Sequence, residues 1–462
     1  MNERVPQGLG GFGYWVLAIA VLCLATVLRF YHLGVWSIWV DEGMTYLRAS
    51  TGQLSDQGPM YSTAPLNFLV TRWVIQLAST TPFWLRFFPA LCGVAGVGAV
   101  IWTGTRLAGR TAGLVAGLLL ALSAWHIEWS QNARHFSAVF LFMTLALGAF
   151  FVYWESGKVG WLATSCLATG LGLATHSSSA FALIAMGAYA GTLVLLPRFR
   201  EQVVTRGKII GTIAAAFLIA AVYVPIALSV SSYLGEHKTA WNSPGNVAGS
   251  IAFYAGSLPL TIGFAVGIVE SYGGRRGPLV ALHWLVWPIV LAVLAATRTI
   301  SSNAYALVSL GGLVILLGIG VDRLMTEAGP VRMMGAILLV GLVAEFGAGT
   351  WLYFGPEQGN RPPWREAAAW VTRVAGPRDT VYATEGIAVG YYLENSARAQ
   401  WLDQWRAPTA GATQWLLVLG GRTALPESPL TGFLDQKCVL RQVFYRNTGP
   451  KRRDIEAYRC GP

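Results

Sequence analysis

Charged residues are scarce in this sequence. Asp, Glu, Lys and Arg together make up 12% of its 462 residues, whereas 54% are hydrophobic. Many of the hydrophobic residues fall in runs of about 20, which is long enough to cross a bilayer as a helix. The composition therefore predicts a polytopic membrane protein, and not the roughly three soluble domains that the length alone would suggest.

Cysteine is scarce too, and its pattern excludes a zinc site. Of five cysteines, Cys23, Cys92 and Cys166 lie inside apolar runs, and no CxxC or Cys/His metal-binding spacing occurs. Acidic residues are outnumbered by basic ones, which gives a net charge of +11. The Lys and Arg residues lie in short loops between apolar runs and not on one amphipathic face. They therefore indicate membrane topology and not nucleic-acid binding.

The basic loops also indicate which way each apolar run crosses the membrane, because an excess of Lys and Arg marks cytoplasmic loops. The run Pro65–Leu77 is only 13 residues long and is interrupted by Asn67, Arg72 and Gln76, so we expect an interfacial helix there. If this run does not cross, every basic loop falls on one side. The sequence then predicts eleven spans, namely Tyr14–Tyr31, Arg86–Leu107, Ala112–Ile127, Phe136–Tyr153, Trp161–Thr175, Ala180–Leu196, Ile209–Ser229, Ala248–Val269, Leu279–Ala296, Ala304–Val321 and Met333–Phe354.

The first outer loop carries two adjacent carboxylates, Asp41 and Glu42. They are flanked by Trp36, Trp39 and Tyr46, residue types that favour a membrane–water boundary. Adjacent carboxylates repel each other, so the pair makes sense if one is a base or hydrogen-bond acceptor for a substrate and the other holds a cation or a basic partner. The alternative is an acidic helix start, since acids are favoured in a first turn.

A second polar cluster lies on the same outer side, in the stretch EWSQNARH at residues 128–135. Arg134 suits a phosphate partner, and Gln131 or Asn132 would donate to a hydroxyl-rich ligand. A lone Arg at a span end is otherwise a snorkelling anchor. Arg298 lies on the outer side against the charge rule, which makes it a candidate anion ligand. His176 ends a span at the outer boundary and is either a site residue or satisfied by the backbone.

Several of these motifs resemble one family. They are WxxWVDEGMTYLRA, APLNFLVTRW, LRFFPALCGVAG, GRTAGLVAGLLLALSAWHIEWSQNARHFSAVFLF and LGLATHSSSAFALIA, in that order over about the first 200 residues. They resemble the membrane glycosyltransferases of the protein O-mannosyltransferase and aminoarabinose transferase superfamily, which have the GT-C fold. The chain departs from that pattern at Ser62, Thr63 and Ala64, where members often carry His or Lys, and at Asn132 and His135, where many carry Glu and Tyr.

The resemblance implies transfer of a sugar, with inversion, from a polyprenyl-phosphate carrier at the outer face. Asp41 would be the base, and Glu42 would orient the acceptor or bind a divalent cation; no other cofactor is implied. The remaining expected contacts fall into two groups. Donor and phosphate contacts would come from Arg134, Arg298, Gln131, His135 and Arg86, and acceptor or substrate contacts from Tyr61, Asn132 and His176.

The C-terminal part of the sequence, residues 355–462, is less hydrophobic than the rest. A helix with the sequence WREAAAWVTRVAG precedes four strand-like segments, so a small α/β domain is expected on the outer face. Cys438 and Cys460 lie equally far from the middle of the turn-prone NTGPK. An antiparallel hairpin would set them opposite each other, close enough for a disulfide.

Taken together, the sequence predicts a mainly α polytopic membrane protein of the GT-C type. Residues 1–354 would form the transmembrane domain, with the outer loop 32–85 holding the acidic pair, and residues 355–462 the extracytoplasmic domain. The predicted activity is inverting glycosyl transfer in a bacterial-type inner membrane, from a polyprenyl-phosphate sugar to a glycan, lipid or protein acceptor, with membrane lipids as further partners. A transporter or flippase, or a ligase of lipid-linked glycans, remains the alternative, although no internal repeat typical of transporters is found.

Overall fold

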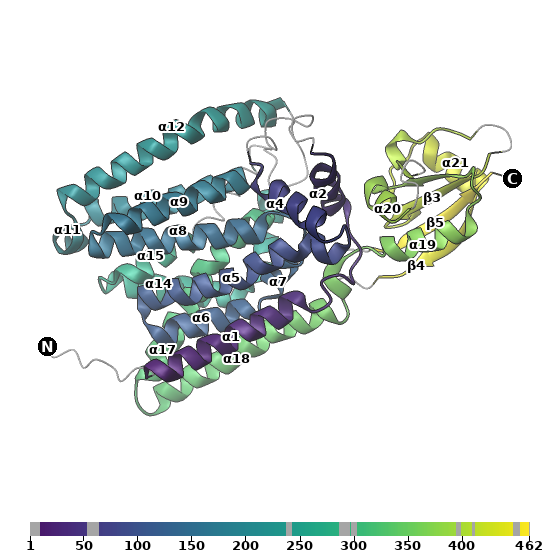
Figure 1. Ribbon diagram of the computed structural model, residues 1–462. Helices are drawn as coiled ribbons and strands as arrows, with labels where there is room; N and C mark the ends of the chain where they lie inside the picture. The colour runs from purple at the N-terminus through teal and green to yellow at the C-terminus, as the bar shows by residue number, and fades with distance from the viewer. Residues whose placement is uncertain are drawn as a thin grey trace.

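The computed structural model describes residues 10–52, 64–236, 243–285, 296, 303–393, 399–408, 412–446 and 453–461. Long helices lie side by side in a bundle, and a small sheet domain follows the last of them at one end (Figure 1). The expected Tyr61 and Arg298 fall outside the described residues.

Long apolar helices dominate the described part of the bundle. Seven are long and apolar enough to cross a membrane: α1 (Gly11–Phe30), α5 (Pro82–Ala108), α8 (Phe136–Ser156), η1 with α10 (Ser177–Ala180 and Phe181–Leu195), α12 (Arg206–Glu236), η2 with α17 (Asn303–Val308 and Ser309–Thr326) and α18 (Pro330–Phe354). The pair α6 (Arg110–Ala121) and α7 (Ala124–Ser130), bent by 64°, would be an eighth span. The predicted integral membrane protein is thereby confirmed.

Shorter helices complete the bundle: α9 (Val159–Thr175), α11 (Pro197–Val203), α13 (Pro244–Ala255), α14 (Ser257–Tyr272) and α15 (Arg276–Leu285). Each of the eleven predicted spans overlaps at least one of these helices or of the long ones, although Leu279–Ala296 extends beyond α15 into residues outside the described part. The predicted span Ala248–Val269 is divided, because Gly256 adopts a left-handed backbone conformation (φ 79°) between α13 and α14.

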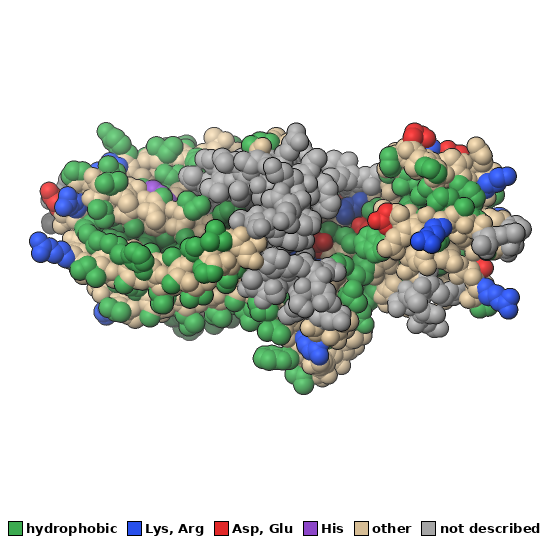
Figure 2. Space-filling model, turned by 90° about the horizontal axis from the view of Figure 1, so that it is seen from above, with side chains coloured by type: hydrophobic (Ala, Val, Ile, Leu, Met, Phe, Trp, Pro, Cys, Tyr) green, Lys and Arg blue, Asp and Glu red, His purple; other side chains and the backbone are tan. Residues whose placement is uncertain are grey.

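The interior of the bundle is apolar and closely packed. Helix α17 is the most buried of the long apolar helices, and its Leu313, Val314 and Leu317 are almost completely buried. Helices α5 and α6 approach closely at Gly104 and Gly113, where an added Cβ on Gly104 would lie 2.9 Å from the Gly113 Cα. Small residues at helix crossings are typical of membrane bundles. The exposed flank is mostly hydrophobic, with Lys and Arg at the end remote from the sheet domain (Figure 2). This surface matches a lipid environment.

Two short helices lie between α1 and α5. Helix α2 (Val40–Thr51) carries the acidic pair, and α4 (Leu66–Leu77) packs against α2 and α5. Twelve helical residues span about 18 Å, which is too short to cross the hydrocarbon core. Helix α4 therefore corresponds to the predicted interfacial helix Pro65–Leu77.

The C-terminal part forms a five-stranded sheet in the order β2-β1-β3-β5-β4, with β1 parallel to β2 and β3 and the other pairs antiparallel. Cys438 lies directly opposite Cys460 in the β4–β5 ladder, and the two form a disulfide. Trp364 and Trp415 lie in the apolar core on one face. The elements are η3 (Gln358–Asn360), α19 (Trp364–Val374), β1 (Thr380–Ala383), α20 (Gly386–Tyr392), β2 (Ala399–Trp401), η5 (Leu402–Gln404), β3 (Gln414–Leu419), η6 (Arg422–Ala424), α21 (Pro429–Lys437), β4 (Cys438–Phe444) and β5 (Ile455–Cys460).

Candidate active site

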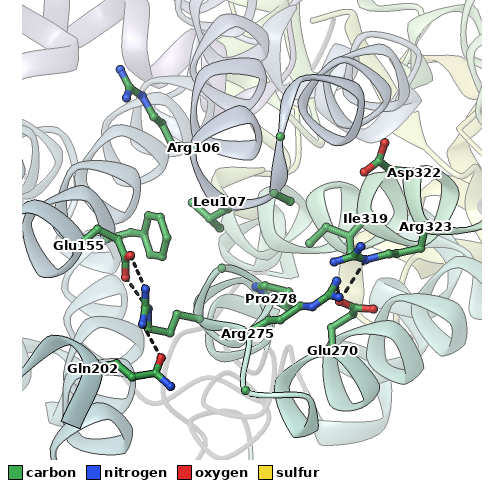
Figure 3. A pocket seen from close by; sticks show the side chains of 16 residues that line it. Arg106, Leu107, Glu155, Gln202, Glu270, Arg275, Pro278, Ile319, Asp322 and Arg323 are labelled. Atoms are coloured by element: carbon green, nitrogen blue, oxygen red, sulfur yellow. Dashed lines mark hydrogen bonds and ion pairs between the residues drawn. The ribbon is translucent and has the colours of Figure 1, made fainter. Parts of the chain in front are cut away.

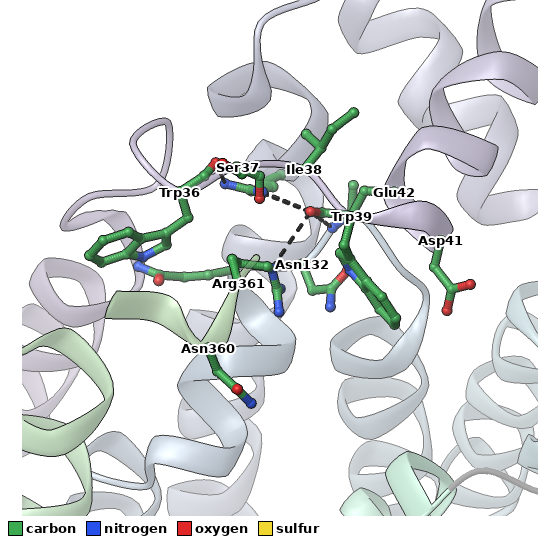
Figure 4. A network of polar contacts seen from close by, with 12 residues as sticks. Trp36, Ser37, Ile38, Trp39, Asp41, Glu42, Asn132, Asn360 and Arg361 are labelled. Carbon is green, nitrogen blue, oxygen red and sulfur yellow. Dashed lines mark hydrogen bonds and ion pairs between the residues drawn. The ribbon is translucent and has the colours of Figure 1, made fainter. Parts of the chain in front are cut away.

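The site is built around the first turn of α2, at the end of the bundle nearest the sheet domain (Figure 1). Asp41 and Glu42 are consecutive in that turn. Successive residues of an α-helix point about 100° apart, so two neighbours can face different environments. Figure 4 shows the Asp41 carboxylate pointing away from the cluster that surrounds Glu42.

Glu42 faces the protein interior and is fully buried. Both of its carboxylate oxygens accept from Arg86, over 2.7 Å from Nε and 2.7 Å from Nη2, and Oε1 also accepts from the Ala133 amide over 2.9 Å. Burial alone would raise the pKa of the Glu42 carboxyl, but the Arg86 guanidinium outweighs burial and holds that pKa below its ordinary value. Glu42 is therefore an ionised anchor for the start of α2.

Arg86 has a structural environment and not that of a phosphate ligand. It is fully buried, and besides Glu42 it donates over 3.0 Å to the carbonyl oxygens of Leu33, Trp36 and Ser37. These bonds occupy all five N–H groups of the guanidinium. In this structure no N–H of Arg86 is left for a donor phosphate, and the expected phosphate contact of Arg86 stays a prediction.

Asp41 faces outward, and its side chain is 40% exposed. Its Oδ2 lies 3.7 Å from Nε of Arg134, whose side chain is 13% exposed. This distance is too long for a hydrogen bond, but it still leaves the Arg134 cation next to the accessible Asp41 carboxylate. Asp41 and Arg134 thus offer a base and an anion-binding group side by side.

A third arginine, Arg361, reaches the site from the segment that follows α18. Its Nε lies 3.8 Å from Glu42 Oε2, its Nη1 lies 3.8 Å from Glu128 Oε1, and its guanidinium stacks over the Trp39 ring at 5.7 Å. It is 4% exposed. Neighbouring Asn360 donates to Glu128 over 3.1 Å. Arg361 could not be predicted from the sequence, because nothing near it in the chain points to Glu42.

Two imidazoles lie close to the Arg134 guanidinium. The His135 and His176 rings stack with 3.8 Å between centroids and 5° between planes, and the Tyr305 ring lies 5.2 Å from His176. The Ser178 amide donates to Nδ1 of His176 over 3.1 Å, so the proton of the neutral ring is on Nε2. Burial first, and the Arg134 guanidinium second, lower the pKa of His176 to about 3.

Comparison with known proteins bears on the fold that holds these residues. Residues 62–225 match the family model described as dolichyl-phosphate-mannose-protein mannosyltransferase. No curated protein matches the chain. The structure of ArnT from Cupriavidus metallidurans bound to undecaprenyl phosphate is 15% identical and aligns with a TM-score of 0.60, over 97% of this chain and 98% of that one. The fold is that of the GT-C glycosyltransferases.

A second GT-C structure supports the same fold. Archaeal oligosaccharyltransferase AglB from Archaeoglobus fulgidus, in complex with an inhibitory peptide and a dolichol-phosphate, is 12% identical with a TM-score of 0.53, over 89% of this chain and 70% of that one. The predicted resemblance and the predicted fold class are therefore confirmed. The family-model match also agrees with the predicted class of enzyme.

Within this GT-C fold, the two predicted amide ligands have different environments. Gln131 is fully buried, its Nε2 donates to the carbonyl oxygens of Leu28, Arg29 and Tyr31, and its Oε1 accepts from the Tyr353 hydroxyl over 3.0 Å. Its polar atoms are occupied in holding helix ends together. By contrast, Asn132 accepts from Trp39 Nε1 over 3.3 Å, while its Nδ2 has no hydrogen-bond partner among the described residues.

The groups around Glu42 do not fit a metal ion. Both Glu42 oxygens already accept from Arg86, and two further cationic or amide groups approach them. Within the described residues, no three His, Cys, Asp or Glu side chains are grouped closely enough to hold a metal ion.

Figure 3 shows a second feature of the bundle, a cavity of about 510 Å³. Arg106, at the end of α5, helps to line it and is 20 residues, or roughly 30 Å of helix, from Arg86. Other arginines of the cavity are paired with acids. Arg276 binds Glu155 over 2.7 Å, and Glu270 pairs with both Arg275 and Arg323. These ion pairs tie helix ends together, and the cavity is separate from the acidic pair.

Proposed function

We propose that the chain is an inverting glycosyltransferase that moves a sugar from a polyprenyl-phosphate donor to an acceptor hydroxyl of a glycan, lipid or protein. The observation that carries this proposal is the different environment of two adjacent carboxylates. Glu42 is buried and neutralised by Arg86, whereas Asp41 is accessible and lies next to Arg134. The site therefore offers one working carboxylate.

One carboxylate suffices for a single displacement at the anomeric carbon, which inverts that centre by the logic of inverting glycosidases. Asp41 accepts the proton of the acceptor hydroxyl as its oxygen bonds to the anomeric carbon. The bond from that carbon to the phosphate oxygen breaks, and the electron pair leaves with the polyprenyl phosphate. Because a phosphate is already a competent leaving group, no second carboxylic acid is needed to protonate it.

Arg134 is the proposed partner of the departing phosphate. Its guanidinium, 3.7 Å from Asp41, is close enough to shift from the base to an incoming anion, which would free Asp41 for the acceptor. Arg298 remains a proposed second phosphate contact. Asn132, with an unpartnered Nδ2, and His135, whose Nε2 also lacks a hydrogen-bond partner among the described residues, are proposed contacts of the sugar or phosphate. His176 and Tyr61 remain proposed substrate contacts.

The donor is proposed to be a polyprenyl-phosphate sugar because the two structures described above hold undecaprenyl phosphate and a dolichol-phosphate in the same fold. A lipid donor can reach the acidic pair sideways from the bilayer, since the pair lies at the end of the bundle. The basic residues at the opposite end are expected to face the cytoplasm. We accordingly propose an inner, bacterial-type plasma membrane, with residues 1–354 embedded in it and residues 355–462 outside.

The test is a transfer assay with purified protein in lipid nanodiscs. A panel of polyprenyl-phosphate hexoses and pentoses is offered with a membrane acceptor fraction, and both the released polyprenyl phosphate and the anomeric configuration of the product are determined. We expect phosphate release matched by a product of inverted configuration. Movement of the intact donor across a proteoliposome membrane without phosphate release would instead support a flippase and overturn the proposal.

A further inference from the structure

Helix α2 begins without a cap of its own. Its N-cap residue, Trp39, makes no side-chain capping bond. Helix starts normally use Ser, Thr, Asp or Asn, whose side chains accept from the first free amides. Here the amide of Val40 donates to Oε2 of Glu385 over 3.1 Å. The acceptor is supplied by the C-terminal domain, 345 residues further along the chain.

Glu385 is itself held in place. Trp364 Nε1 donates to the same Oε2 over 2.8 Å, and Trp364 is fully buried in the core of the C-terminal domain. A carboxylate fixed at this position also complements the positive end of the α2 dipole. Glu385 thus joins the rigid core of one domain to the helix start of the other.

The rest of α20 also contacts the start of α2 and the residues just before it. Glu385 is the N-cap residue of α20, and Tyr392 is its last residue, whose hydroxyl accepts from the Ile38 amide over 2.8 Å. Between them, Ile387 packs on Gly43, where an added Cβ would lie 3.2 Å from the Ile387 side chain. One helix of the C-terminal domain therefore contacts the chain on both sides of Asp41.

We propose that Glu385 is a positioning residue for Asp41, and that the C-terminal domain completes the active site by fixing the start of α2. This inference rests on the proposed function. Asp41 directly follows Val40, so release of the Val40 amide would loosen the turn that aims the Asp41 carboxylate. Misplacement of a catalytic group by about 1 Å can cost roughly a hundredfold in rate.

Three variants separate positioning from simple domain packing. Glu385→Ala removes the cap, whereas Glu385→Gln keeps an oxygen that can accept from Val40. Glu366→Ala is the matched control. Glu366 also belongs to the C-terminal domain, and it accepts over 3.3 Å from the hydroxyl of Ser37, which lies before α2 and not in it. We expect Glu385→Ala to lower kcat by roughly ten- to a hundredfold with little change in KM for the donor. Glu385→Gln should restore most of kcat, and Glu366→Ala should change it little.

A second measurement does not depend on activity. Hydrogen exchange of the peptide that contains Val40 should become faster in Glu385→Ala than in the wild type, Glu385→Gln or Glu366→Ala. If the wild-type protein transfers no sugar, the proposed function fails while this exchange result still decides the role of Glu385. Unchanged exchange at Val40, or a wild-type kcat in Glu385→Ala, would overturn the positioning role. If Glu385→Ala does not fold, a Glu385→Gln protein with greatly reduced kcat would overturn it as well.

Discussion

At the scale of single residues, the acidic pair shows how far two neighbours can differ. Glu42 is fully buried and bound by Arg86, while Asp41 is 40% exposed. Sequence reasoning could tell that two adjacent acids need different partners, but not which acid would be buried. The helical phase of α2 decides that, because it directs Glu42 toward the start of α5 and leaves Asp41 at the opening.

The buried pair should dominate the stability of this region. Removing one partner of a buried ion pair leaves an uncompensated charge and costs about 3–5 kcal/mol. We therefore expect Arg86→Gln to lower the free energy of unfolding by about that amount, seen as a lower thermal midpoint in detergent. Asp435→Asn, at an exposed pair with Arg422 in the sheet domain, is the control and should shift the midpoint little. Equal midpoints for the two variants would contradict this account.

Acid should weaken the same pair. The pKa of Glu42 is lower in the folded protein than its ordinary value, so its stabilising contribution is present above the unfolded pKa of about 4.3. The contribution is lost as the pH falls through the lower, folded pKa. The thermal midpoint of the wild type should therefore fall more steeply below about pH 4 than that of Glu42→Gln.

The stacked histidines give a second prediction at this scale. Since burial lowers the pKa of His176 to about 3, the ring is neutral at physiological pH. Arg134, and not a histidine, is then the proposed partner of the phosphate charge. Between about pH 5 and 8, the affinity for the donor should therefore not change through titration of His176. An inflection near pH 6.5 that disappears in His176→Asn would show that the ring titrates and would contradict this view.

At the scale of elements, the break between α6 and α7 places the polar cluster at the site. Arg29 donates to the freed carbonyls of Leu120 (3.0 Å) and Ala121 (2.9 Å), and also to His126 Nδ1 over 2.8 Å. Broken helices inside a bundle need such partners. The sequence predicted the span Ala112–Ile127 but not its break, because the group that satisfies the break lies 91 residues away on α1.

The close approach of α5 to α7 can be tested with two glycines of α5. An added Cβ on Gly93 would lie 2.2 Å from the Ser130 hydroxyl, whereas on Gly98 its nearest neighbour would be a Leu22 methyl group at 3.6 Å. Gly93→Ala should therefore cost about 1–3 kcal/mol of stability through overpacking. Gly98→Ala, the matched control, should leave the thermal midpoint nearly unchanged. A wild-type midpoint for Gly93→Ala would show that α7 can move away freely.

At the scale of the whole molecule, local patterns predicted the elements and long-range contacts completed the site. Hydropathy and turn signals predicted the long apolar helices, the short helix α4 and four of the five strands, because each signal lies within about 20 residues. Strand β2 was not predicted. Arg361 and Glu385 were not anticipated. Their partners, Glu42 and Val40, lie more than 300 residues earlier, and only the return of the chain after α18 brings them together.

Topology is the prediction that belongs to this scale. Reporter fusions after Lys208 should be cytoplasmic, and fusions after Leu77 and Trp370 external, because the basic loops gather at the end opposite the acidic pair. A cytoplasmic signal at Trp370 would place the C-terminal domain and the acidic pair on opposite sides of the membrane. That result cannot be reconciled with the contact between Glu385 and Val40.

The most direct test of the whole account is the Asp41→Asn protein, which keeps the size and most of the hydrogen bonding of the side chain but loses its basicity. Donor binding, by native mass spectrometry, and sugar transfer are compared with those of the wild type and of Arg134→Ala. Asp41→Asn should bind the donor normally while turnover falls by roughly two to four powers of ten. Arg134→Ala should instead weaken donor binding, by about 1.5–3 kcal/mol for a lost charge-assisted contact. Near-normal transfer by a folded Asp41→Asn protein would contradict the assignment of Asp41 as the base.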